Sequence, residues 1–415
     1  MDNASSPSIN GWQRGFWSLM ATQFQNAFSD NALKNLIILL VLARPMSDAE
    51  RNTYVVLAGA LFAAPFILFS MFGGWLADRF SKKYIMNCVK LAEIGIMLFA
   101  ALSLMLKSLP MELVSVFFMG CHSAIFGPSK YGILPEVLPL EKLSWGNGIL
   151  ELLTFLGIIF GTVAGAFFAG SFTGMQGFSG LILMALAFIG WRVSLNITPV
   201  AAADPHCPVR MNPITDLYKQ LKVMKKDRDL WRANWGNTGF YFIAALVQMN
   251  LLIYAKDVLH LSETHNGMLS AALALGIGIG SVAAGFASRG HIEYRLVPIG
   301  AAGLALSTIP MGMPGIGIIG FTISLLALGF SAGLFIVPIA AVLQHRPPPE
   351  SKGAVQGAVN LLSFIGILAA SAAQWISFET LHLTPGQVFW VCGGFAILTG
   401  AYAAISRKHF IQSES

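Results

Sequence analysis

"EKLSWGNGILELLTFLGI", residues 141–158, recurs 209 residues further along the chain as "ESKGAVQGAVNLLSFIGI", residues 350–367, with no gap in the alignment. When the window is extended to 119–158, eleven of forty aligned positions are identical. Apolar composition alone can produce part of such a match, but the identities include a proline, a glutamate and three glycines. The sequence therefore predicts two halves that share one architecture.

Long apolar blocks surround this repeat. Of the 415 residues, 55% are hydrophobic and 11% are charged, and the mean hydropathy is +0.66, whereas soluble domains carry about a quarter charged residues. A spanning helix needs about 20 mostly apolar residues, and twelve blocks have this length. We therefore expect an all-α membrane protein with twelve transmembrane helices in two six-helix pseudo-symmetric halves, and not a soluble protein with a large core. The blocks lie at 16–42, 53–76, 84–106, 111–134, 145–170, 178–198, 233–255, 266–288, 296–318, 319–343, 354–378 and 386–406.

One long polar stretch, residues 199–230, separates these blocks into two sets of six. We expect an N-terminal six-helix half at 1–198, a cytoplasmic linker at 199–230 and a C-terminal six-helix half at 231–415. The second part of the linker, from Ile214 to Leu230, is rich in lysine and is predicted to be helical. The linker is interpreted as a solvated tether whose lysines set the topology.

The basic residues are distributed unevenly between the predicted loops. If the N-terminus is cytoplasmic, the loops, tails and helix ends on that side hold 19 of the 26 Lys and Arg residues, and the opposite side holds four. The positive-inside rule then places both termini in the cytoplasm. This distribution explains the basic residues without nucleic acid as a partner.

The sequence contains no pattern typical of an enzyme or a metal protein. Its four cysteines include no C-x-x-C pair, so neither a disulfide framework nor a zinc site is indicated. No catalytic nucleophile, metal cluster or phosphate-binding loop is recognisable. We expect a protein that is not an enzyme and that uses no cofactor and no metal.

The first apolar block carries polar residues where lipid would be expected. Asn26, Asp30 and Lys34 are spaced four residues apart, which places them on one face of a helix. Charges within membrane spans cost several kcal/mol each unless they are paired or hydrated, so they mark a pathway by default. Asp30 and Lys34 could instead neutralise each other, but a pathway role is favoured.

The fourth and fifth blocks add further polar residues. Lys130, Tyr131 and Glu136 lie in "GPSKYGILPE" (127–136), and Asn147 and Glu151 lie in "NGILE" (147–151). Lys130 and Glu136 belong either to substrate binding or to a gate network, and the sequence favours neither. The candidate substrate-binding residues of the whole chain are Asn26, Asp30, Lys34, Lys130, Tyr131, Asn147, Glu151, Asn237, Tyr241 and Asn360.

The two halves differ in charge. The six predicted spans of the second half contain no Asp, Glu, Lys or Arg. In the repeat alignment Lys130 matches Ile339, and Glu151 matches Asn360. The halves therefore share a skeleton, but the membrane charge is predicted to lie in one of them.

Other polar and small residues in the spans have simpler interpretations. Lys90 and Glu93 are interpreted as a structural ion pair on the third span, and His122 as a packed or hydrogen-bonded histidine rather than a proton relay. The glycines of "GALFAAPFILFSMFGG" and "GIGIG" are predicted to be helix-packing positions.

The loop "GGWLADRFSKK" (73–83) resembles the G-x-x-x-D-R-x-x-[KR]-[KR] loop of the major facilitator superfamily, whose members are built from two six-helix repeats. Asp78 and Arg79 are expected to make ionic contacts at the cytoplasmic face. The second-half counterpart, "GFASRGHIEYR" (285–295), lacks the aspartate, so we expect a strong latch in only one half. The predicted gating residues are Asp78, Arg79 and Glu136.

Within that superfamily the chain resembles the bacterial lysophospholipid transporters. The resemblance rests on "FSDNALK" (28–34), "GPSKYGILPE" (127–136) and "NGILE" (147–151). It implies a monomeric, multi-pass protein of the bacterial inner membrane that moves lysophospholipids, chiefly lysophosphatidylethanolamine, for reacylation. The expected partners are the lysophospholipid substrate, membrane lipids and a separate acyltransferase, because no H-x-x-x-x-D acyltransferase signature is found in this chain.

A lysophospholipid has a charged head and one acyl chain, which fits the charge difference between the halves. As a hypothesis, Lys34 or Lys130 attracts the phosphate, Asp30 or Glu151 attracts the amine, and the uncharged half receives the acyl chain. An exporter of drugs or other amphipathic molecules on the same fold is the main alternative. A membrane scaffold or sensor without transport activity is a second one.

Overall fold

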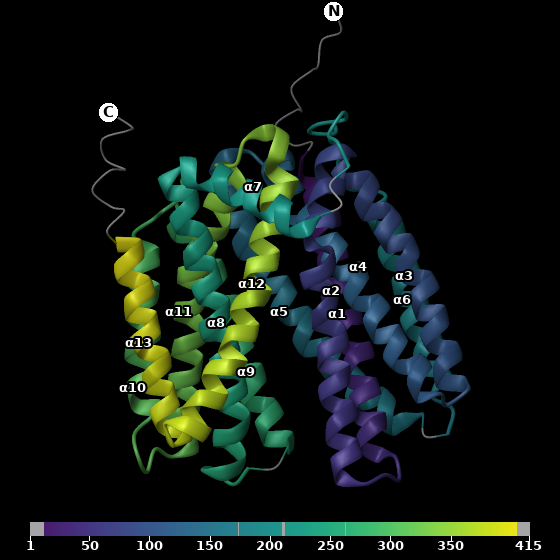
Figure 1. Ribbon diagram of the computed structural model, residues 1–415, viewed down its shortest axis with the longest axis vertical. Coiled ribbons are helices and arrows are strands. Elements are labelled where there is room, and N and C mark those ends of the chain that lie inside the picture. Colours follow the sequence, from purple (N-terminus) through teal and green to yellow (C-terminus); the bar gives the residue numbers. More distant parts are fainter. Residues whose placement is uncertain (1–11, 173, 210–211, 262, 405–415) are drawn as a thin grey trace, which may run out of the picture. The chain divides into compact units, whose positions relative to one another are not determined.

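The computed structural model describes residues 12–404 apart from 173, 210–211 and 262 (Figure 1). The described part of the chain forms thirteen α-helices, one short 3-10 helix and one π-helical turn. The α-helices are α1 (Trp12–Ala43), α2 (Asp48–Arg79), α3 (Lys82–Met105), α4 (Leu109–Val137), α5 (Leu140–Ser171), α6 (Gly177–Ser194), α7 (Pro213–Lys226), α8 (Arg228–Asp257), α9 (Glu263–Ala287), α10 (Leu296–Met311), α11 (Ile318–His345), α12 (Lys352–Trp375) and α13 (Pro385–Ala404). The 3-10 helix, Pro349–Ser351, precedes α12, and the π-helical turn, Ile376–Thr380, follows it.

All of these helices except α7 correspond to the twelve apolar blocks of the sequence. Within the described residues, ten helices are long and apolar enough to cross a membrane, judged by length and composition. The predicted span 296–318 was too long, because α10 has 16 residues and ends at Met311. Pro310 lies in its last turn and Gly312 is its C-cap, which is consistent with the ability of these two residue types to end helices.

The helix predicted from Ile214 to Leu230 is interrupted at Asp227, where α7 gives way to α8. The Asp227 side chain accepts hydrogen bonds from the backbone N–H groups of Asp229 (3.0 Å) and Leu230 (3.2 Å), as an N-cap residue does. Arg346, directly after α11, donates to both Asp227 carboxylate oxygens at 2.8 and 3.0 Å. Burial alone would raise the pKa of the Asp227 carboxyl, but the hydrogen bonds from Arg346 and from the cap hold it below its ordinary value.

The structure consists of two compact units. Unit 1 contains the described residues of Met1–Pro139, Gly157–Leu217 and Pro348–Ala358, and unit 2 those of Leu140–Leu156, Tyr218–Pro347 and Val359–Ser415. Each unit thus contains most of one predicted half and a short segment of the other. The two exchanged segments are the N-terminal parts of α5 and α12, and both belong to the sequence repeat. The halves 1–198 and 231–415 remain a prediction from that repeat.

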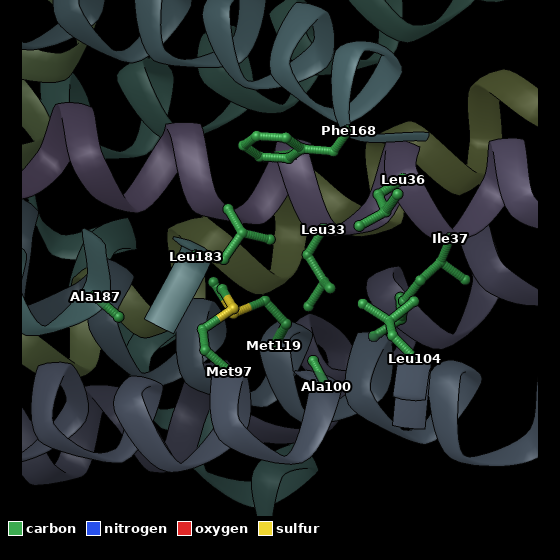
Figure 2. Packing of buried hydrophobic residues seen from close by; sticks show 12 residues of the cluster. Leu33, Leu36, Ile37, Met97, Ala100, Leu104, Met119, Phe168, Leu183 and Ala187 are labelled. Atoms are coloured by element: carbon green, nitrogen blue, oxygen red, sulfur yellow. The ribbon is translucent and has the colours of Figure 1, made fainter. Parts of the chain in front are cut away.

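The core of unit 1 is formed by α1, α3, α4, α6 and the second part of α5. Leu33 and Leu36 of α1 pack with Met97 of α3, Met119 of α4 and Phe168 of α5 (Figure 2). Lipid is as apolar as these side chains, so close van der Waals packing holds such helices together.

Glycines permit the helices to approach closely, as the sequence predicted. A Cβ atom on Gly73 would lie 2.9 Å from Ile125 Cα, where α2 meets α4. In unit 2, a Cβ atom on Gly276 would lie 2.6 Å from the Leu326 carbonyl oxygen, where α9 meets α11. Both "GALFAAPFILFSMFGG" and "GIGIG" therefore contain packing glycines.

Unit 2 also contains an aromatic cluster that joins α8, α11 and α13. Tyr254 stacks on Phe321 with the ring centroids 4.7 Å apart, and its edge meets Phe389 at 5.4 Å. Asn250 Nδ2 donates to the Pro385 carbonyl at 2.8 Å, which joins α8 to the start of α13. These contacts give the second half a rigid frame without buried ionic groups in the spans concerned.

We predict that Asp227→Ala destabilises the protein by about 1 kcal/mol at pH 7, because it removes an N-cap and one of the two carboxylates, Asp227 and Asp229, that bind Arg346. A thermal-shift assay in detergent would show a lower Tm. The pKa of Asp227 is lowered in the folded state, so its stabilising contribution is present above the unfolded pKa. The contribution is lost as the pH falls through the folded value.

The Tm difference between wild type and Asp227→Ala should accordingly shrink in acid. Asp48→Ala is a suitable control, because the Asp48 side chain is 90% exposed and its ion pair is with Arg51, one turn away. Such surface pairs contribute little. An equal loss of Tm in both variants would contradict the prediction.

Candidate functional site

Asp30 of α1 is a buried carboxylate held by one of its two oxygens. Its Oδ2 atom accepts a hydrogen bond from Ser123 Oγ of α4 at 2.6 Å and one from Asn26 Nδ2 at 3.1 Å. Asp30 is 7% exposed and Asn26 is 5% exposed. Among the described residues, no group donates a hydrogen bond to Asp30 Oδ1. One face of this carboxylate therefore retains its capacity to bind a donor.

A chain of polar side chains extends from Asp30 into the interior of unit 1. His122 Nδ1 lies 3.4 Å from Ser123 Oγ, and His122 Nε2 lies 3.4 Å from Glu93 Oε2. Glu93 also accepts a hydrogen bond from Gln25 Nε2 at 2.9 Å. Lys90 contacts Gln25 Oε1 and forms the ion pair with Glu93 that the sequence predicted. We call Asp30, Ser123, His122, Glu93, Lys90 and Gln25 the buried polar cluster.

Lys34 lies one turn from Asp30 but is engaged elsewhere. Its Nζ atom lies 3.3 Å from Asn31 Oδ1 and 5.0 Å from the centroid of the Phe62 ring. The second contact is a cation–π interaction. Within the described residues, Asp30 and Lys34 therefore do not form a direct ion pair with each other.

Lys130 and Tyr131 are neighbours in α4, and Glu136 lies at its end. Lys130 is 8% exposed, and its Nζ atom lies 4.2 Å from the centroid of the Tyr131 ring. Glu136 forms a 2.7 Å ion pair with Lys82, the first residue of α3, whose side chain is fully buried. This ion pair joins two helix ends on the linker side of unit 1, where the sequence predicted a gate.

The predicted gating residue Asp78 binds the start of α12. Its carboxylate is fully buried and accepts hydrogen bonds from the backbone N–H groups of Gly353 at 2.6 Å and Ala354 at 3.0 Å. The first N–H groups of a helix have no partner within the helix, and the helix dipole favours negative charge there. This contact of Asp78 is therefore one between a charge and a helix terminus.

Arg79, the last residue of α2, joins the end of this helix to the linker. Its Nη1 atom donates to the Cys207 carbonyl at 2.8 Å, while the Asp204 N–H donates to the Asp78 carbonyl at 2.9 Å. The guanidinium also lies 5.5 Å from the centroid of the Trp75 ring. Arg79 thus contacts a carbonyl and an aromatic ring.

Glycines bring α2 and α12 into backbone contact next to Asp78. A Cβ atom on Gly74 would lie 2.6 Å from the Gly353 carbonyl oxygen, and one on Gly357 would lie 2.6 Å from the Ser70 carbonyl oxygen. No larger residue fits at these positions without moving a helix. We call this crossing, with its Asp78 cap, the first closure contact.

Unit 2 contains an equivalent crossing between α5 and α9. A Cβ atom on Gly148 would overlap the Ser281 carbonyl oxygen, and one on Gly285 would lie 2.9 Å from Trp145 Cα. Gly148 is the repeat partner of Gly357, so the repeat produces the same kind of crossing in each unit. We call this crossing the second closure contact.

The second closure contact is secured by two amides. Asn147 Nδ2 donates to Gln344 Oε1 at 3.0 Å, and Gln344 Nε2 donates to Asn147 Oδ1 at 2.7 Å. Asn147 is 0% exposed and Gln344 is 1% exposed. The sequence led us to expect a weak latch in this half because the aspartate is missing, but a neutral amide pair is present there. Both amide atoms of Asn147 are engaged, so substrate binding by Asn147 would require this pair to open.

The remaining predicted residues lie in unit 2. Asn237 of α8 is 5% exposed and donates from Nδ2 to Ser363 Oγ of α12 at 2.8 Å. Tyr241 lies one turn further along α8 and meets the Phe240 ring edge-on. Glu151 is 6% exposed, and Asn360 is half-buried. Asn237, which was predicted to bind substrate, thus joins α8 to α12 by donating a hydrogen bond to Ser363.

Three residues of these networks were missed in the sequence. Gln25 lies one residue away from the face of Asn26 and Asp30 that attracted attention. Ser123 directly follows His122, which the sequence analysis discussed. Serine is common in the spans, so the sequence does not indicate which hydroxyl binds Asp30. Gln344 aligns with Pro135 in the repeat, so the alignment gave no signal for it.

Comparison with known proteins agrees with this architecture. Residues 19–371 match the family model described as "Major Facilitator Superfamily". The chain therefore belongs to the major facilitator superfamily, a class of multi-pass membrane transporters rather than enzymes.

Within this class the chain is similar to bacterial lysophospholipid transporters, as its motifs predicted. The lysophospholipid transporter LplT of Klebsiella pneumoniae is 31% identical over 359 residues, which cover 82% of each protein. The LplT of Cronobacter sakazakii is 28% identical over 353 residues, which cover 83% of this chain and 84% of that relative.

Solved structures show the same fold at low identity. The human organic anion transporter MFSD10 superposes with a TM-score of 0.79 at 16% identity, covering 94% of this chain and 99% of that one. The transporter FucP in the outward conformation superposes with a TM-score of 0.75 at 12% identity over the same shares. These two matches concern the fold alone.

We predict that Asp78→Ala loosens the first closure contact, because the N–H groups of Gly353 and Ala354 lose a charged acceptor. Hydrogen bonds to charged groups contribute about 1.5–3 kcal/mol, so amide exchange at 353–354 should accelerate roughly 10- to 100-fold. Hydrogen–deuterium exchange mass spectrometry of the 348–358 segment measures this rate. Unchanged exchange in that segment would contradict the assignment, and Asp48→Ala serves as the control.

For the second closure contact we predict a strong coupling between Asn147 and Gln344. Either alanine variant alone leaves one buried amide without its partner and should cost about 1–3 kcal/mol. The double variant should cost clearly less than the sum, as a double-mutant cycle of thermal stability in detergent would show. Asn35 and Thr162, 3.3 Å apart and more exposed, form the control pair, and purely additive effects at Asn147 and Gln344 would argue against a latch.

Proposed function

We propose that this protein moves lysophospholipids, such as lysophosphatidylethanolamine, across the bacterial inner membrane by alternating access, so that they can be reacylated. The similarity to LplT proteins over most of the chain supports this substrate class. The positive-inside pattern of the sequence supports cytoplasmic termini. A separate acyltransferase would consume the lysophospholipid, with the transporter acting as a monomer.

The buried carboxylate of Asp30 is the observation on which the proposal rests most. A charge within a membrane span requires a partner, and Asp30 Oδ1 accepts no hydrogen bond within the described residues. The ammonium group of an ethanolamine head supplies both a positive charge and three N–H donors. Such charge-assisted hydrogen bonds are about twice as strong as neutral ones.

The phosphate and the acyl chain would be bound by other parts of the chain. Lys34 and Lys130 are the candidate partners of the phosphate, and both lie in unit 1 with much of their charge shielded from water. The predicted spans of the second half hold no charged residue, which suits contact with the acyl chain. Glu151 stays a candidate for the amine.

Alternating access would require the closure contacts to open and reform. On the proposed topology both lie near the cytoplasmic ends of their helices, since Asp78 and Arg346 neighbour the linker and the linker-side loops. The glycine crossings allow the helices to close tightly, and Asp78 and the Asn147–Gln344 pair supply polar locks that water can replace on opening.

We predict that Asp30→Asn and Lys130→Ala each reduce the flux of lysophosphatidylethanolamine into proteoliposomes by at least about tenfold, consistent with the loss of one charge-assisted hydrogen bond. Lys142→Ala, at an exposed position in the first turn of α5, should transport normally at equal protein content. Normal flux in both charge variants would remove the assigned roles.

The same vesicles distinguish the alternatives. Export of a cationic dye together with no lysophospholipid flux would favour the drug exporter. No flux of any amphipathic molecule would favour the scaffold or sensor.

A further inference from the structure

Helix α7 of the linker shows an inverted pattern of burial. Its buried stripe consists of Asp216, Gln220 and Met224, each one turn from the next, and the two polar members are 3% and 4% exposed. On the outer side, Ile214 and Tyr218 are 79% and 58% exposed. A surface helix with water on its outer side normally turns its apolar stripe toward the protein. The interpretation of the linker as a solvated tether therefore leaves the outer side of α7 unexplained.

The same outer side is strongly basic. Lys222 and Lys225 continue the face of Ile214 and Tyr218 at spacings of four and three residues. Lys222 Nζ lies 4.5 Å from the centroid of the Tyr218 ring, so the ring and the charge share one surface. The exposed lysines of α7 are Lys219, Lys222, Lys225 and Lys226. We call these four lysines, with Ile214 and Tyr218, the basic face.

No exposed carboxylate of α7 neutralises the basic face. Asp216 is the single acidic residue within this described helix, and it is buried. Asp227 and Asp229, which follow α7 along the chain, bind Arg346. The helix dipole favours lysines in the last turn, which accounts for Lys225 and Lys226 but not for the other two. The basic face thus calls for an anionic partner.

The start of α8 indicates which anionic surface is at hand. α7 ends at Lys226 and α8 begins at Arg228, and α8 is long and apolar enough to cross a membrane. The lysines therefore lie directly beside a membrane span. Basic clusters in this position bind anionic lipid headgroups, and interfacial helices combine lysines with apolar and aromatic residues in this way. An acidic protein segment would match the lysines but would give no reason for the exposed Ile214 and Tyr218.

We propose that the basic face of α7 binds the anionic phospholipids of the bilayer surface that α8 enters. The lysine ammonium groups contact the lipid phosphates while their aliphatic stems, like the Tyr218 ring, lie against the glycerol and upper acyl region. The linker is then a segment bound to the membrane surface and not a free tether. This inference goes beyond the proposed function and does not depend on it, because no residue of the basic face is assigned to the transported lipid.

Photocrosslinking of the full-length protein tests the proposal. Tyr218→p-benzoylphenylalanine keeps an aromatic ring at an exposed position. The variant is reconstituted in vesicles of phosphatidylethanolamine with a minor share of phosphatidylglycerol, irradiated, and digested, and the lipid adducts are identified by mass spectrometry. Leu98→p-benzoylphenylalanine is the control, because Leu98 lies in the exposed apolar stripe of α3 with Leu91 and Leu102 and should report the average lipid composition.

We expect phosphatidylglycerol to be enriched about threefold or more among the adducts at 218 relative to those at 98. At about 1 M salt, where the screening length is about 3 Å, the two positions should show the same composition. Replacement of the four lysines by glutamine should abolish the enrichment at low salt. Replacement of Lys142 and Lys256, two exposed lysines outside α7, by glutamine should leave it unchanged.

Two results would overturn the proposal. Equal lipid composition at both positions at low salt would show that the lysines recruit no anionic lipid. Absence of lipid adducts at 218, or adducts to protein alone, would show that the basic face does not lie on the bilayer. The salt series uses the native lysines, so the proposal stays testable even if the lysine-to-glutamine variant fails to fold.

Discussion

A charged side chain within a membrane helix must find its partners inside the protein, and the first unit is organised by this constraint. Lys90 and Glu93 of α3 are fully buried, and they bind each other and Gln25 of α1. His122 and Ser123 of α4 continue the network to Asp30. Three helices are thereby fixed in register by side chains that would be costly to expose. The network ends at Asp30, whose Oδ1 atom accepts no hydrogen bond within the described residues. This oxygen is the atom that we propose binds the substrate.

The sequence repeat has a structural counterpart in the two closure contacts. Gly357 and Gly148 occupy equivalent places, and each lets its helix approach a backbone carbonyl of a neighbouring helix. The polar locks differ, since Asp78 caps the start of α12 whereas Asn147 pairs with Gln344. A duplicated skeleton thus carries a charged lock in one unit and a neutral one in the other. The charged lock depends on a helix terminus, and the neutral one on two well-aligned amides, so their opening should respond differently to pH and to salt.

The helices and the duplication were predictable because hydrophobic block length and glycine spacing are local properties of the sequence. The predicted ion pair of Lys90 and Glu93 was correct for a similar reason, because the two residues lie three positions apart on one helix. The partner of Asp30 could not be predicted, because Ser123 lies 93 residues away and serine is common in the spans. The end of α10 was missed because hydrophobicity continues past Met311, while the chain turns at Pro310 and Gly312. Asn147 was recognised as a polar residue within a span. Its partner Gln344 was not, because Gln344 aligns with Pro135 in the repeat and so no amide recurs at that position.

The proposed function depends on one claim, that Oδ1 of the buried Asp30 binds the ammonium group of a lysophospholipid. A structure of the protein determined with lysophosphatidylethanolamine in a nanodisc tests it most directly. We predict the ammonium nitrogen within hydrogen-bonding distance of Asp30 Oδ1, at about 2.7–2.9 Å, with Ser123 still bound to the other oxygen. A headgroup seated elsewhere, with Oδ1 contacting only water or protein, would contradict it.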